Sequence, residues 1–223
     1  MSSVMREIRR ADERYQTDGD GVMTRHSFSY GAHYDPDNIG FGPLIAINTE
    51  TIDPAEGYDQ HHHADVEIVT WVLEGVLMHA DSTGHRGVVR PGTAQRLSAG
   101  TGVQHTEQNA SQDEPLVFVQ MMLRSSYDAK PEYVDAVVEP RGLTPVIGVH
   151  AAAELFVVRL AAGDSITVPA SPRSLVHVTK GSIRLDDTTL TGGDEARLTD
   201  ERAYDLSAAE DGGEALIWQL GSS

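Results

Sequence analysis

The chain has 223 residues and contains no cysteine. This absence excludes disulfide bridges, a thiolate nucleophile and zinc sites built on thiolates, and it suits a reducing compartment. No run of about 18 apolar residues occurs, so we expect no membrane-spanning helix. The charged first ten residues also lack the apolar stretch of a secretory signal. We therefore expect a cytoplasmic protein with no membrane partner.

Positive charge is scarce as well. Lysine and arginine number 17 against 34 aspartate and glutamate residues, which gives a formal net charge of −17 and a sequence pI near 4.8. Such a field repels phosphate backbones and anionic lipid surfaces, and no basic patch interrupts it. Nucleic acid is therefore not an expected partner, and we interpret the acidic surface as solubilising.

Helical periodicity is the third scarce feature, and only the first dozen residues and a short turn near 201–208 are candidates for helix. Hydrophobic residues make up 39% of the chain, which is enough for a packed core. Short apolar segments bounded by turns recur roughly every ten residues, a spacing typical of antiparallel sandwiches and barrels. The expected strands are 41–47, 67–73, 87–90, 94–98, 116–123, 154–160, 165–168, 175–179, 182–185, 195–198 and 215–220.

The strand pattern is interrupted over residues 125–145 and then resumes. The segment Leu175–Gly181 parallels Ile68–Gly75, and the second half repeats the first in outline. Two copies of one β-module are the simplest interpretation. The sequence thus predicts an N-terminal domain over 1–124, a linker, and a C-terminal domain over 146–223.

Two histidine motifs carry the chemistry. Three consecutive histidines begin at His61, and a second motif joins His105 to Glu107. Each lies beside a segment with strand character, in which residues two apart share a face. His61 and His63 therefore point the same way, and so do His105 and Glu107.

Two such pairs can surround one divalent metal. Three imidazoles and one carboxylate suit Fe, Ni, Cu, Mn or Zn, and they leave positions open on a six-coordinate ion. Open positions favour chemistry over a structural clip. A histidine run can also be a tag or an exposed tract. This run is internal and continues directly into the strand-like segment Val66–Gly75, which favours a built site.

Three further segments accompany the histidines: Trp71-Val72-Leu73-Glu74-Gly75, Asp81-Ser82-Thr83-Gly84 and Ala99-Gly100-Thr101-Gly102-Val103-Gln104-His105-Thr106-Glu107. Together these motifs resemble the cupin superfamily and, more narrowly, the pirin family. The segment from Tyr34 to Leu44 is also similar to bacterial members. The resemblance is close over roughly residues 5 to 125 and holds in outline over the rest.

The resemblance implies an all-β bicupin, in which two antiparallel β-sandwich or jelly-roll barrels pack together and the first holds the metal. It also implies that His61, His63, His105 and Glu107 are the ligands and that Glu107 is catalytic. General cupins take their carboxylate from the first motif, which here would be Glu67. Residue geometry alone admits either carboxylate.

One position departs from the family. Pirins usually have proline between the two histidines, where this chain has His62. Alternation turns His62 away from His61 and His63, unless a β-bulge shifts the strand. Replacement of a proposed ligand by His62 or Glu67 therefore stays open.

The other histidines give weaker indications of a functional role. In the second copy, His177 stands alone, so we expect no equivalent metal site there. The remaining histidines lie in or near turns and are interpreted as solvated; they are His26, His33, His79, His85 and His150. For His79, which follows a strand of the first module, an approach to the expected pocket is the alternative.

The resemblance further implies one divalent transition metal, Fe(II) first, with Zn, Ni, Cu, Mn or Co as alternatives. It implies a ring-cleaving dioxygenase of the quercetin 2,3-dioxygenase type, acting on a flavonol or another enolisable aromatic with dioxygen. In that reaction Glu107 accepts the proton of a flavonol hydroxyl, and the central ring opens with loss of carbon monoxide.

Two other functions remain open. Some pirin-like proteins resemble regulators, in which the metal senses redox state and binding to a protein partner is the output. The metal could also merely stiffen the first barrel. We expect a monomer, because internal duplication already pairs the two sheets.

Overall fold

The computed structural model describes residues 5–221. Over this range the secondary structure consists of antiparallel strands and one short 3-10 helix, as the expected all-β class requires. Every strand expected from the sequence overlaps an observed strand. No helix in the described residues is both long and apolar enough to cross a membrane.

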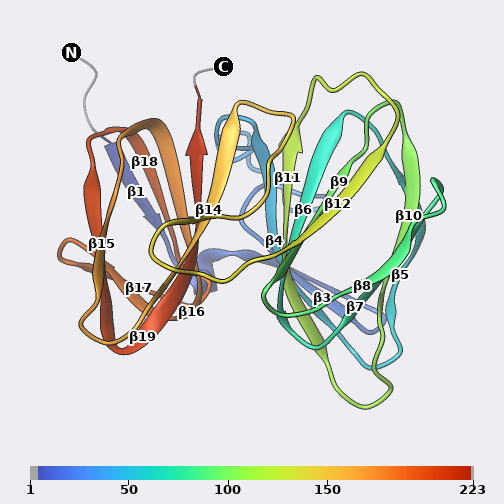
Figure 1. Ribbon diagram of the computed structural model, residues 1–223, viewed down its shortest axis with the longest axis horizontal. Helices are drawn as coiled ribbons and strands as arrows, with labels where there is room; N and C mark the ends of the chain where they lie inside the picture. Colours follow the sequence, from blue (N-terminus) through green and yellow to red (C-terminus); the bar gives the residue numbers. More distant parts are fainter. Residues whose placement is uncertain (1–4, 222–223) are drawn as a thin grey trace. The chain divides into compact units, whose positions relative to one another are not determined.

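The chain divides into two compact units, each a β structure (Figure 1). The N-terminal unit comprises Tyr15–Val138 and Val149–Ala151. Its large sheet has the order β12-β9-β6-β11-β4-β3-β2, and its small sheet has the order β5-β10-β7-β8. The strands are β2 (Tyr15–Gly19), β3 (Val22–His26), β4 (Leu44–Ile52), β5 (Gly57–His63), β6 (Val66–Glu74), β7 (Leu77–Asp81), β8 (Arg86–Val89), β9 (Thr93–Ser98), β10 (Val103–Asn109), β11 (Leu116–Arg124) and β12 (Glu132–Val137).

Apolar side chains join the two sheets of the N-terminal unit at two places. One cluster contains Leu77 of the small sheet and Val72 of the large sheet. The other contains Val103 of the small sheet and Ile68 of the large sheet. Alternation along β6 places Thr70 on the same face, between Ile68 and Val72. The interior of the unit therefore has a polar layer between two apolar ends.

The C-terminal unit contains the described residues up to Arg14, Glu139–Gly148 and those from Ala152 onward. One sheet runs β1-β18-β16-β19-β14-β13, with β15 paired to β19 and β17 paired to β16. Its elements are β1 (Met5–Arg9), a 3-10 helix (Ala11–Glu13), β13 (Thr144–Pro145), β14 (Ala153–Leu160), β15 (Ser165–Val168), β16 (Ser171–Leu185), β17 (Thr188–Thr191), β18 (Glu195–Glu201) and β19 (Tyr204–Leu220).

The described residues of both segments with helical character lie mostly in strands, so the helix prediction was wrong for them; residues 1–4 of the first segment lie outside the described residues. The first contains β1, which pairs with β18 in the C-terminal unit. The carboxylate of Asp194 holds this end, because it accepts hydrogen bonds from the Arg10 guanidinium (2.7 Å) and the Ala11 backbone N–H (2.8 Å). The second spans the end of β18 and the start of β19. Local propensity is a weak prior, and pairing with a distant strand overrides it.

The compact units follow other boundaries than the predicted domains. The described residues up to Arg14 group with the C-terminal unit, and the N-terminal unit continues to Val138. Within the expected linker, 125–145, β12 pairs with β9 along its whole length, from Glu132 opposite Ser98 to Val137 opposite Thr93. The sequence of this edge strand, Glu-Tyr-Val-Asp-Ala-Val, does not alternate polar and apolar residues, so no period of two marks it as a strand.

Candidate metal centre

The two histidine motifs lie on neighbouring strands of the small sheet (Figure 1). Strand β10 pairs with β5, so that His105 lies opposite His61. On its other side β10 pairs with β7, where Asp81 lies opposite His105 and His79 opposite Glu107. His105 on β10 therefore lies between potential metal ligands of β5 and of β7.

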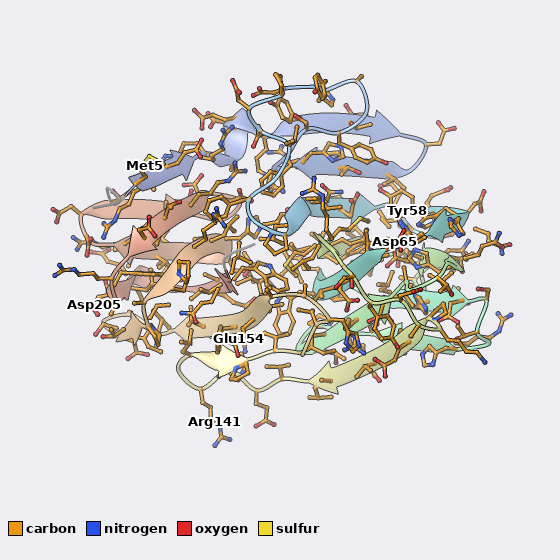
Figure 2. All side chains as sticks on the ribbon, turned by 90° about the horizontal axis from the view of Figure 1, so that it is seen from above. Met5, Tyr58, Asp65, Arg141, Glu154 and Asp205 are labelled. Atoms are coloured by element: carbon orange, nitrogen blue, oxygen red, sulfur yellow. The ribbon has the colours of Figure 1, made fainter. Side chains whose placement is uncertain are left out.

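The imidazoles of His61, His63 and His105 converge. The ring centroids of His61 and His105 are 4.3 Å apart, those of His61 and His63 are 4.9 Å apart, and those of His63 and His105 are 5.1 Å apart. One ring nitrogen from each lies within 4.8 Å of the others. Alternation along β5 thus brings His61 and His63 to one side. Figure 2 labels Tyr58, near the start of this strand, and Asp65, just beyond its end.

Glu107 lies two residues from His105 along β10, so the two side chains share a face of the small sheet. Its carboxylate, one nitrogen of His79 and one of His105 lie within 4.8 Å of one another. The amide of Gln120 donates to Glu107 Oε2 over 2.7 Å, and the side chain is 1% exposed. Burial raises the pKa of Glu107 to about 7, although the Gln120 hydrogen bond opposes the shift. The four predicted ligands are therefore spread over two groups that share His105.

Five buried polar atoms at this place have no hydrogen-bond partner within the described chain: His63 Nε2, His79 Nδ1, both ring nitrogens of His105 and Glu107 Oε1. Each unpaired buried polar group costs about 1–3 kcal/mol, so such a concentration calls for a missing partner. Burial first, then the neighbouring histidines, lowers the pKa of His63 to about 4 and that of His105 to about 2. Neutral imidazoles and a carboxylate are the donors that first-row divalent metals take, so the residues fit a metal ion.

The side chain of His62 points away from the His61, His63 and His105 imidazoles. It is exposed, whereas His61 and His63 are partly buried. A Cβ placed on Gly102 would lie 2.9 Å from His62 Nε2, so the His62 ring packs over the Gly102 backbone. His62 belongs to neither group of potential ligands in the described residues.

Glu67 also belongs to neither group. Its buried carboxylate accepts hydrogen bonds from the Ser98 hydroxyl (2.8 Å), the Ser125 hydroxyl (3.2 Å) and the His150 backbone N–H (3.2 Å). The guanidinium of Arg96 lies 3.9 Å away. This carboxylate ties β6 to β9 and to the segments that contain Ser125 and His150.

Replacing Glu67 by glutamine should therefore lower the free energy of unfolding by about 1–3 kcal/mol, because an amide cannot accept all of these hydrogen bonds. Metal content should stay unchanged. Urea unfolding and elemental analysis of the purified variant would measure both quantities. Glu74→Gln, an exposed change at the end of the same strand, is the matched control. Loss of metal with unaltered stability would instead make Glu67 a ligand.

A cavity of about 450 Å³ opens beside the histidines. Its wall includes Glu50, buried in β4, whose Oε2 accepts hydrogen bonds from the Tyr58 hydroxyl (2.7 Å) and the Thr24 hydroxyl (2.5 Å). The complete lining is Thr17, Thr24, His26, Tyr30, Ile45, Ala46, Asn48, Glu50, Tyr58, His61, His63, Glu107, Gln120 and Met122. Burial, followed by the charge of Glu50, raises the pKa of Tyr58, so its phenol stays protonated.

Most residues that line this cavity were not predicted from the sequence as part of the site. Glu50, Thr24 and Tyr58 belong to three strands and carry no motif, so only their pairing could have assembled them. His26 and His79 were interpreted as solvated, but they are 2% and 0% exposed. The ring of His26 stacks on Tyr30 with centroids 4.9 Å apart. In the C-terminal unit His177 is buried, and its Nδ1 lies 3.1 Å from Glu195 Oε1.

Comparison with known proteins identifies the family. Residues 7–123 match the family model described as Pirin. A protein of Escherichia coli named quercetin 2,3-dioxygenase is 31% identical over 226 residues, which cover 96% of this chain and 97% of that protein. The chain belongs to the pirin family.

The match extends over both halves of this pirin-family chain. Residues 136–220 match the model described as Quercetinase C-terminal cupin domain, which confirms the expected bicupin. A Mycobacterium tuberculosis protein that carries the dioxygenase name provisionally is 40% identical over 232 residues, covering 96% of this chain and 94% of that protein. The crystal structure of a bacterial pirin from Escherichia coli in complex with nickel(II) superposes with a TM-score of 0.92 at 29% identity, covering 98% of this chain and 100% of that one.

Proposed function

We propose that this protein is a metal-dependent ring-cleaving dioxygenase that acts on flavonols such as quercetin. The observation that carries the proposal is the set of unpartnered, buried imidazole and carboxylate atoms beside a cavity. His61, His63, His105 and Glu107 are the proposed ligands. The relatives named quercetin 2,3-dioxygenase support this reaction class.

The chain's own residues supply binding and proton transfer. A divalent ion held by the three histidines would act as a Lewis acid that stabilises the deprotonated flavonol and engages dioxygen. Glu107 accepts the proton from the flavonol 3-hydroxyl. Gln120 fixes the orientation of this carboxylate through its hydrogen bond to Oε2.

The cavity suits a planar aromatic with hydroxyl groups. Ile45, Ala46 and Met122 give it an apolar wall, while Glu50 and Glu107 supply acceptors for hydroxyl protons. Two carboxylates in one cavity disfavour phosphate or carboxylate substrates, because like charges repel. A volume of about 450 Å³ lies in the range of small-molecule sites, roughly 300–1,000 Å³.

Fe(II) is the proposed ion, and dioxygen is the proposed co-substrate. A site of imidazoles and one carboxylate accepts several first-row ions, with affinity rising from Mn to Cu, so Ni, Zn, Cu, Mn and Co stay alternatives. The nickel complex of the similar Escherichia coli pirin supports a site that can accept an ion other than Fe(II). We also propose that the protein works as a cytoplasmic monomer.

The test is an aerobic assay of protein loaded separately with Fe(II), Ni(II) or Co(II) in the presence of quercetin. The flavonol absorption band should bleach with uptake of one dioxygen and release of one carbon monoxide per quercetin consumed. Metal-stripped protein and an anaerobic sample are the controls. A fully metallated sample that leaves the band unchanged with every ion overturns the flavonol assignment.

Metal binding should depend on pH through Glu107. Burial raises the pKa of this carboxyl from its ordinary value of 4.5 to about 7, so below pH 7 a proton competes with the ion for the carboxylate. Affinity should therefore rise about tenfold per pH unit between pH 5.5 and 7 and level off above. His63 and His105, with pKa values of about 4 and about 2, are already neutral in this range.

Chelator competition at successive pH values would measure this slope, and calorimetry in buffers of different ionisation enthalpy would count the released proton. Glu107→Gln should flatten the profile. A slope that survives this substitution would assign the released proton to another group.

A further inference from the structure

His105 lies between two sets of partners. Strand β10 runs between β5 and β7, so His61 and His63 approach the imidazole from one side and His79 from the other. The ring centroids of His79 and His105 are 5.5 Å apart. Both nitrogens of His105 are buried and lack a hydrogen-bond partner in the described chain.

A neutral imidazole has one nitrogen that bears hydrogen and one that carries a lone pair. If the nitrogen of His105 on the β5 side binds the ion, the nitrogen on the β7 side must carry the hydrogen. That buried N–H then needs an acceptor. Glu107 is occupied as a ligand under the proposed function, which leaves Nδ1 of His79. Neither this atom nor a nitrogen of His105 has a hydrogen-bond partner in the described chain, so the bond between them is itself part of the inference.

His79 can accept because Asp81 sets its tautomer. Nε2 of His79 lies 3.1 Å from Asp81 Oδ2, and both side chains are fully buried. An ionised Asp81 can only accept, so His79 carries its hydrogen on Nε2 and has a lone pair on Nδ1.

We propose that Asp81 and His79 form a positioning pair that accepts the second N–H of His105 and so holds His105 in its metal-binding tautomer. Outer hydrogen bonds of this kind orient a ligating histidine and increase its basicity. The inference rests on the metal-binding part of the proposed function and not on the substrate or the reaction.

Asp81→Asn is the decisive substitution. The carbonyl oxygen of asparagine can keep the turn, because Asp81 Oδ1 accepts from the Thr83 backbone N–H (2.8 Å), the Thr83 hydroxyl (2.5 Å) and the His85 N–H (3.3 Å). The amide then faces His79 Nε2 and donates to it. This reverses the tautomer of His79 and sets two N–H groups against each other at His105.

The measurement is the dissociation constant for Co(II), obtained by chelator competition, together with the Co(II) electronic spectrum. Asp81→Asn and His79→Leu should weaken binding about 10- to 100-fold and shift the spectrum. His79→Asn, which places an amide oxygen near the position of Nδ1, should restore most of the affinity. His85→Gln is the matched control, since the ring of His85 lies 5.9 Å from His79 and stacks on Tyr133.

Three outcomes would overturn the inference. Wild-type affinity and spectrum in both Asp81→Asn and His79→Leu would remove the role of the pair. Four coordinated imidazoles in the wild-type protein, counted by X-ray absorption, would make His79 a ligand. A wild-type chain that binds no divalent ion would overturn this inference and the proposed function together, whereas failure to cleave quercetin with intact metal binding would affect the proposed function alone.

Discussion

Replacement of His105 by alanine should reduce the affinity for Ni(II) or Co(II) by more than about 100-fold, beyond the range expected for loss of an outer hydrogen-bond partner. His105 is the residue that both groups of potential ligands share, so its removal leaves neither group with three members. Flavonol cleavage should fall to the level of metal-stripped protein. Elemental analysis after purification and calorimetric titration would measure the loss.

Measurements of thermal stability distinguish loss of metal binding in His105→Ala from unfolding of the variant. The alanine removes two buried nitrogens that have no partner in the described chain, so the metal-free variant should be nearly as stable as metal-free wild type. Added metal should raise the midpoint of thermal unfolding of the wild type and leave that of the variant unchanged.

His62→Ala is the matched control, because this exposed histidine lies between the two proposed ligands of β5. It should bind metal as the wild type does. If His62→Ala weakened binding as strongly as His105→Ala, strand alternation would have selected the wrong histidines.

Glu107→Gln should lower kcat for flavonol cleavage by about 10²- to 10⁴-fold, the range typical of losing a general base. Glutamine keeps the shape of the buried side chain but cannot take up the hydroxyl proton. The Michaelis constant should change far less, because the cavity wall formed by Glu50, Tyr58 and Met122 is untouched. Steady-state kinetics at saturating metal, with metal content verified for each sample, would make the measurement.

Glu67→Gln provides the comparison that decides between the two carboxylates. Its hydrogen bonds to Ser98 and Ser125 give it a structural role on β6, so kcat per metal ion should stay near that of the wild type. A large loss of kcat in Glu67→Gln with none in Glu107→Gln would reverse the assignment and restore the ligand pattern of general cupins.

The sequence determined the chemistry available at the site. Alternation along β5 required His61 and His63 to share a face and turned His62 away, because successive side chains on a strand point to opposite sides. The motif spacing was sufficient to indicate the family and the two-module plan. These features are local, so a single sequence can carry them.

The pairing partners and the register of the strands could not be predicted from the sequence. The register of β10 against β7 places His79 opposite Glu107 and Asp81 opposite His105, and it gives His105 partners on both sides. In the same way, pairing with β18 converts the expected N-terminal helix into β1.

The sequence by itself thus determined which side chains can act as ligands and which way they face along their own strands. The tertiary structure decided which carboxylate and which additional histidine reach His105, and how Glu50 and Tyr58 complete the cavity. The physical reason is that a period of two fixes a face locally, whereas register depends on core packing between residues far apart in the chain.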